Sequence, residues 1–120
     1  MSLPTYEFTT EGLTRAMKAL GDTTAKVHQS LFVLGVRGPR GCESNCPLAQ
    51  YVHFVYPQVQ QVYVYLDEDR NAFVVARAGH GKDAVWIESD DLPVHGEFVR
   101  NHDKGMYPDL IEEDADARVA

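Results

Sequence analysis

The spacing of apolar residues changes at Pro57, and this change limits the folds that the chain can adopt. Before the proline, apolar residues recur three and four positions apart, which is the spacing of one helix face. After it, Val62, Val64 and Leu66 alternate with two tyrosines, which is the period of a strand. The sequence therefore predicts an α+β domain in which helices come before a small sheet.

The first two helices are predicted to form an antiparallel hairpin. The first begins at a threonine cap, Thr9 or Thr10, and ends at Gly21, because glycine is common just past a helix end. The second begins at residues 22–23 and continues to the Gly-Pro pair at 38–39, because proline lacks the N–H that a helix needs. Its apolar stripe is expected to contain Val27, Leu31, Phe32, Leu34 and Val36.

A third helix and a three-stranded antiparallel meander are predicted to follow. The helix opens with Pro47 at its first position and closes at Pro57. The three strands cover residues 62–66, 72–77 and 84–88, and polar turns join them. Short connections of this kind favour antiparallel pairing over a parallel crossover.

The end of the domain is predicted to be a C-terminal helix and a returning segment. Asp90, Asp91 and Pro93 open this helix, where acidic residues suit the positive end of the helix dipole. Its buried face is expected to contain Val94, Phe98, Val99 and His102. An extended segment, residues 106–111, then packs back, so that residues 1–111 form one compact domain. Residues 112–120 are acidic and small, which predicts a disordered tail.

Charge is unevenly distributed along the 120 residues, whose net charge is −7. Residues 1–60 hold five Lys/Arg and four Asp/Glu, whereas residues 61–120 hold six and fourteen, a balance of −8. Direct nucleic-acid binding is not expected, because phosphate contacts require a basic face. An acidic half suits a basic partner protein instead. Residues 1–10 show no secretory signal and the chain has no apolar run of membrane length, so a cytoplasmic protein is expected.

Cys42 and Cys46 are the residues that most suggest chemistry. Cys46 precedes the expected helix start at Pro47, where backbone N–H groups favour a thiolate, and Arg37 and Arg40 add positive charge. A zinc site is one interpretation, with His53 and His28 as the available further ligands, although structural zinc sites usually have a second matching pair of ligands. A redox pair and two thiols that only pack in a loop are the alternatives.

Aromatic residues suggest a binding surface on the sheet. Tyr63 and Tyr65 share one face of their strand, and Trp86 lies on the third strand. Tyrosine is favoured at interfaces because it buries a large area and keeps a polar group. We therefore take these three residues, with Arg37 and Arg40, as candidate binding residues. The alternative is that helices cover both faces and that the tyrosines belong to the core.

Several segments together resemble a group of small uncharacterised proteins of actinobacteria and their phages, over about residues 36–110. They are Val36–Gly38, Cys46–Ala49, Tyr51–Val52, Val85–Ile87, Leu92–Pro93, Glu97–Val99 and Asp103–Leu110. The resemblance implies a small intracellular domain that stands alone. It implies no catalytic role.

The sequence favours a non-enzymatic interaction module, such as a regulator or an inhibitor, whose acidic C-terminal half meets another protein or a second copy. No nucleophile and base stand at a convincing spacing, and no phosphate-binding loop is present. The alternative function is a thiol-dependent redox protein or a metal-binding protein that uses Cys42 and Cys46.

Overall fold

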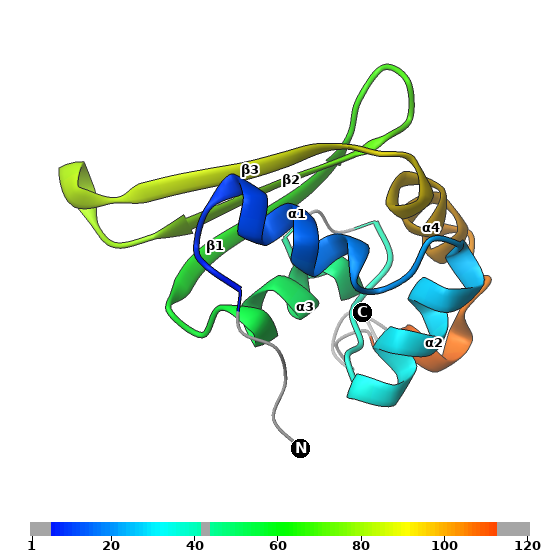
Figure 1. Ribbon diagram of the computed structural model, residues 1–120. Helices are drawn as coiled ribbons and strands as arrows, with labels where there is room; N and C mark the ends of the chain where they lie inside the picture. Colours follow the sequence, from blue (N-terminus) through cyan, green and yellow to red (C-terminus); the bar gives the residue numbers. More distant parts are fainter. Residues whose placement is uncertain (1–5, 42–43, 113–120) are drawn as a thin grey trace.

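The computed structural model describes residues 6–41 and 44–112 and confirms the α+β fold class. Helices occupy one side of a three-stranded antiparallel sheet, and α4 lies at one end of it (Figure 1). The elements are α1 (Thr10–Lys18), α2 (Thr24–Leu34), α3 (Pro47–Val55), β1 (Val59–Leu66), β2 (Ala72–Ala78), β3 (Val85–Leu92) and α4 (Pro93–Asp103), with short 3-10 turns at Gly81–Asp83 and Pro108–Leu110.

Threonine caps set the starts of α1 and α2, as the sequence predicts. The side chains of Thr9 and Thr23 each accept a hydrogen bond from the backbone N–H three residues on, at 3.0 and 3.1 Å. Helix α2 ends earlier than expected, because Gly35 adopts a left-handed conformation with φ of 74°. The predicted stop at Gly38 is therefore wrong by one turn, and Phe32 is exposed rather than part of the buried stripe.

Helices α1 and α2 are consecutive but pack on different partners. The buried side of α1 lies against β3, and the Thr14 and Ser89 hydroxyls join the two elements at 2.7 Å. Helix α2 instead packs against α4 and the C-terminal 3-10 turn (Figure 1). The two helices follow one another as expected. Each packs mainly against another element, however, and not against its neighbour in the hairpin.

The sheet has the predicted order β1-β2-β3, with both pairs antiparallel. Strand β3 is longer than expected, because Ala72 pairs with Leu92 at its far end. Asp90 and Asp91 consequently lie in the strand, and the prediction that they open α4 is wrong. Helix α4 begins directly at Pro93. The core side of the sheet carries the buried residues Val62, Val64, Val74, Ala76, Ile87 and Ser89.

Helix α4 turns the predicted face toward the core, and it also buries His95 and Gly96. Phe98 and His102 are buried as expected, whereas Val94 and Val99 are only half-buried. Gly96 brings the helix close to the start of β2, where a Cβ atom would meet the Arg70 carbonyl oxygen. The close approach rotates the helix so that its small residue faces the sheet.

The C-terminal segment packs back on the domain, as predicted. The Gly38 N–H donates to the Leu110 carbonyl at 2.9 Å, and the Glu112 N–H donates to the Gly38 carbonyl at 3.2 Å. Leu110 is buried, within a 3-10 turn rather than a fully extended stretch. Of the predicted tail 112–120, only Glu112 lies within the described residues, and it is exposed.

Within the described ranges, no helix combines the length and the apolar character needed to cross a membrane.

Candidate functional site

The sheet face opposite the helices carries a continuous group of aromatic and apolar side chains. Direct cross-strand partners point to the same side of a sheet. Tyr63 pairs with Val75 and Tyr65 pairs with Phe73. Toward β3, Val75 pairs with Glu88 and Arg77 pairs with Trp86, so the same face extends onto β3 and includes one carboxylate. Helices α1 and α3 lie on the other side (Figure 1). We call this surface the outer sheet face, and define it as Tyr63, Tyr65, Phe73, Val75, Arg77 and Trp86.

The side chains of the outer sheet face contact one another but stay accessible. The Tyr63 and Tyr65 rings are stacked with centroids 6.0 Å apart, and the Tyr65 and Phe73 rings lie 6.4 Å apart. The Arg77 guanidinium lies 5.7 Å from the centre of the Trp86 ring. Tyr65 is 37% exposed and Trp86 is 56% exposed. In the part of the chain that the structure describes, helices cover one face only, so the alternative that placed these tyrosines in the core is wrong.

Acidic residues border the outer sheet face. The Tyr65–Phe73 pair is the last outward-facing pair before the β1–β2 loop, whose Asp67, Glu68 and Asp69 are all exposed. This loop projects beyond the end of the sheet (Figure 1). The Asp67 carboxylate accepts the N–H groups of Asp69 and Asn71, both at 2.9 Å, which holds the loop in one conformation. Residues 59–92 carry seven Asp/Glu and three Lys/Arg, a balance of −4.

Arg37 and Arg40, the other candidate binding residues, lie on the loop before α3 and not on the sheet. Both are exposed. A Cβ atom at Gly105 would lie 3.5 Å from the Arg40 guanidinium, which places Arg40 near the end of α4. The adjacent Gly41 N–H donates to the Asp103 carboxylate at 2.8 Å, so this loop is fastened to α4.

Cys46 is the N-cap of α3, directly before Pro47, as the sequence predicts. Its side chain is only 4% exposed, and it makes no capping hydrogen bond to the first turn. It contributes to a cavity of about 330 Å³ that Val64, Val99 and Asp103 also line. A buried sulfur is poorly placed to react with a large partner.

The metal and redox hypotheses depend in part on a residue whose position the structure does not describe. His53 is half-buried in α3, seven residues after Cys46. Cys42 lies outside the described residues. Among the residues that are described, no three His, Cys, Asp or Glu side chains form a group suited to a metal ion. The zinc site and the redox pair remain predictions.

Two buried histidines join α4 to other parts of the chain; the sequence predicted the burial of His102 but not its hydrogen bond, and it assigned His95 no role. The His102 Nε2 atom donates to the Gly38 carbonyl at 3.1 Å, and the His95 Nε2 atom donates to the Met17 carbonyl at 2.6 Å. A carbonyl only accepts, so Nε2 carries the proton in each ring. The His102 Nδ1 atom is buried with no hydrogen-bond partner in the structure. Burial is the main cause that lowers the pKa of both rings, so both are neutral at pH 7.

A third histidine ties α2 to the C-terminal segment. The His28 Nε2 atom lies 2.9 Å from both carboxylate oxygens of Asp109, and its ring lies 4.7 Å from the Tyr107 ring. Tyr107 in turn stacks on Phe98 of α4 at 4.8 Å. These contacts fasten one end of the domain, and the His28–Asp109 pair is partly exposed.

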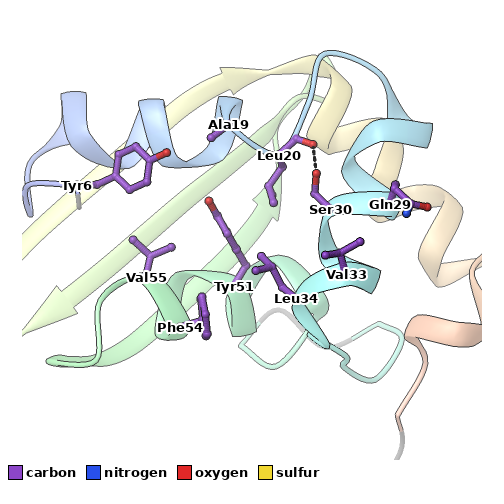
Figure 2. A pocket seen from close by; sticks show the side chains of 10 residues that line it. All are labelled: Tyr6, Ala19, Leu20, Gln29, Ser30, Val33, Leu34, Tyr51, Phe54 and Val55. Atoms are coloured by element: carbon purple, nitrogen blue, oxygen red, sulfur yellow. Dashed lines mark hydrogen bonds between the residues drawn. The ribbon is translucent and has the colours of Figure 1, made fainter. Parts of the chain in front are cut away.

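An apolar cavity of about 600 Å³ lies where the end of α1 meets α2 and α3 (Figure 2). Its rim includes the exposed side chains of Val33 and Phe54. Three hydroxyl groups lie in its wall, those of Tyr6, Ser30 and Tyr51. Sequence reasoning missed this cavity, because its lining comes from α2, α3 and the residues that flank α1, and the spacing of apolar residues does not reveal how these parts pack together. The full lining is Tyr6, Ala19, Leu20, Gln29, Ser30, Val33, Leu34, Tyr51, Phe54 and Val55.

Comparisons of the chain with known protein families, with curated proteins and with solved structures find no match. The geometry of the chain's own residues therefore carries the functional argument.

Proposed function

We propose that this chain is a non-enzymatic interaction module that binds a basic segment of another protein on its outer sheet face. The observation that carries the proposal is the exposed Tyr65, paired with the half-buried Phe73, beside the acidic loop Asp67–Asp69. A lysine or arginine of the partner binds over an aromatic ring while its charge is balanced by a nearby carboxylate.

Aromatic area and acidic charge contribute in different ways. Tyrosine and tryptophan side chains provide most of the buried area at protein interfaces and lose few rotatable bonds. The surrounding carboxylates attract a basic partner from a distance and raise the association rate at low salt. Stacking over Trp86 holds the Arg77 guanidinium on the face, where it repels a cation placed directly on the β2–β3 pair. The partner's basic groups are therefore expected at the Tyr65 end.

A regulatory or inhibitory role and a cytoplasmic location belong to the same proposal, and both rest on the sequence. The charge imbalance between the two halves of the chain supports a basic partner over a nucleic acid. The thiol-dependent alternative has no support from a specific contact, because Cys46 is buried beneath the Pro47 helix start.

The proposal predicts that Tyr65→Ser combined with Trp86→Ala removes a partner that the unaltered protein retains. Affinity capture from lysate is performed at low and at high salt, and each retained protein is then purified and titrated directly. We expect at least a tenfold loss of affinity, because each substitution removes an exposed aromatic side chain from the contact. Salt is expected to weaken the binding of the unaltered protein, because screening reduces the attraction of the carboxylates.

Phe32→Ala is the matched control, because Phe32 is an aromatic residue that is 51% exposed on α2. It should leave partner binding unchanged. Circular dichroism and thermal unfolding check that all variants keep their fold, since substitutions at exposed sites usually change stability little. Equal loss of binding in Phe32→Ala, or a partner whose affinity does not depend on salt, counts against the proposal.

A further inference from the structure

The lining of the cavity between α1, α2 and α3 contains no charged side chain among its ten described residues, although 24% of the chain is charged. A charged ligand would lose its hydration there and find no opposite charge. Apolar contacts come from both sides, with Leu34 and Val55 inside and Val33 and Phe54 at the rim (Figure 2). The cavity therefore suits an uncharged molecule with an apolar body.

Two of the three hydroxyl groups in the wall, those of Ser30 and Tyr51, can meet a bound molecule only as acceptors. The Tyr51 hydroxyl donates its hydrogen to the Ala16 carbonyl at 2.7 Å, and the Ser30 hydroxyl donates to the Leu20 carbonyl at 2.7 Å. Each hydroxyl has one hydrogen, and each carbonyl can only accept, so these hydrogens are already used. On these two groups only oxygen lone pairs remain to meet a bound molecule, and the Tyr6 hydroxyl and the Gln29 amide are the further polar groups of the lining. Tyr51 also keeps its hydrogen at all ordinary pH values, because burial raises the pKa of its hydroxyl.

We propose that this cavity binds a neutral small molecule that has an aromatic or aliphatic body and one N–H or O–H donor. Its volume of about 600 Å³ lies within the range of roughly 300–1,000 Å³ that is usual for small-molecule sites. The apolar body fills the space between Leu34, Val55 and Phe54, and the donor meets the Ser30 or Tyr51 oxygen. The site is separate from the outer sheet face, so it goes beyond the proposed interaction role.

Indole, 1-methylindole and indole-3-carboxylate test the three parts of this proposal. Indole has an apolar ring and one N–H donor, 1-methylindole has the ring without the donor, and the carboxylate adds a negative charge. Each compound is titrated into the full chain by calorimetry and by amide NMR. We expect indole to saturate one site, 1-methylindole to bind about tenfold more weakly, as expected for one lost hydrogen bond, and the carboxylate to bind still more weakly. The shifted amides should belong to α1, α2 and α3.

Ala19→Trp locates the site, because Ala19 is exposed at the end of α1 and lines the cavity. A tryptophan there reaches into the space and should reduce indole affinity at least tenfold. The matched control is Ala25→Trp, the same change at an exposed position of α2 outside the lining. Trp86→Ala should leave indole binding unchanged, so failure of the cavity and failure of the outer sheet face are distinguishable.

Three results overturn the proposal. The first is the absence of saturable indole binding up to millimolar concentration. The second is equal affinity for indole and 1-methylindole, or indole binding that Ala19→Trp leaves intact. The third is a homodimer, seen by sedimentation, that Ala19→Trp dissociates while Ala25→Trp does not, since a second copy would then occupy the cavity.

Discussion

Replacing Gly38 by alanine is expected to lower the free energy of unfolding by about 3 kcal/mol or more. A Cβ atom at this position would meet the Asn45 carbonyl oxygen and would lie 2.8 and 2.9 Å from backbone atoms of Cys46 and Pro47. These are backbone atoms at the start of α3, so no side-chain rotation relieves the contact. The displaced chain would also lose the hydrogen bonds that join Gly38 to Leu110 and to His102.

Gly35→Ala provides the control for this prediction. Gly35 has a left-handed conformation, but nothing lies within 4 Å of an added Cβ atom. Its replacement should cost only about 1 kcal/mol, from backbone strain alone. Urea unfolding followed by circular dichroism measures both variants. If the two substitutions cost the same, then close contact at Gly38 is not what holds the loop to α3.

Acid is expected to destabilise the fold from just below pH 6.5, because two buried histidines stay neutral in the folded chain. The folded-state pKa values of His95 and His102 are lowered from 6.5, first of all by burial. Between the folded and unfolded pKa values the unfolded state binds more protons, so stability falls as pH falls. Each histidine contributes at most about 1.4 kcal/mol per pH unit in that window, and two contribute at most about 2.7.

The charged groups around the rings are few. Lys18 lies near His95 and also lowers its pKa, while Arg40 lowers and Asp103 raises the pKa of His102. Above the unfolded-state pKa, both rings are neutral in the folded and in the unfolded chain. These two histidines should therefore not change the free energy of unfolding between pH 7 and 8.

His102→Gln separates the two contributions, because the glutamine amide can still donate to the Gly38 carbonyl but does not titrate. Urea unfolding at pH 7, 6 and 5 should show a slope about half that of the unaltered chain. The change in slope is the measurement, since the absolute stability also reflects altered packing. An unchanged slope would show that His102 contributes nothing to the acid sensitivity.

Local signals were enough to predict most of the elements. The caps at Thr9 and Thr23 and the proline at Pro47 act through their own backbone neighbours, so a short stretch of sequence reveals them. The change of period at Pro57 likewise places the helices and the strands in their correct order. The candidate face was partly predicted too, since the alternation of Tyr63 and Tyr65 puts both on one side.

Features that depend on distant partners were not predictable in the same way. Strand β3 runs on through Asp90 because β2 offers pairing as far as Ala72, which outweighs the preference of acidic residues for a helix start. The burial of His95 follows from a carbonyl supplied by α1, far away in the sequence. The open side of the sheet and the cavity beside α2 and α3 depend on where α1 and α2 pack. The spacing of apolar residues within each helix does not specify which element that helix packs against.

The order β1-β2-β3 leaves β3 as an edge strand, with consequences for how the protein behaves when concentrated. An unpaired strand invites a second copy to add to it, which is a common route to aggregation. Here the edge carries the exposed side chains of Glu88 and Asp90, and the register with β2 is irregular between Ala72 and Val74. Two such edges brought together would set carboxylates against carboxylates, and the irregular pairing bends the strand. The acidic charge that we propose attracts a basic partner thus also opposes the pairing of two β3 edges.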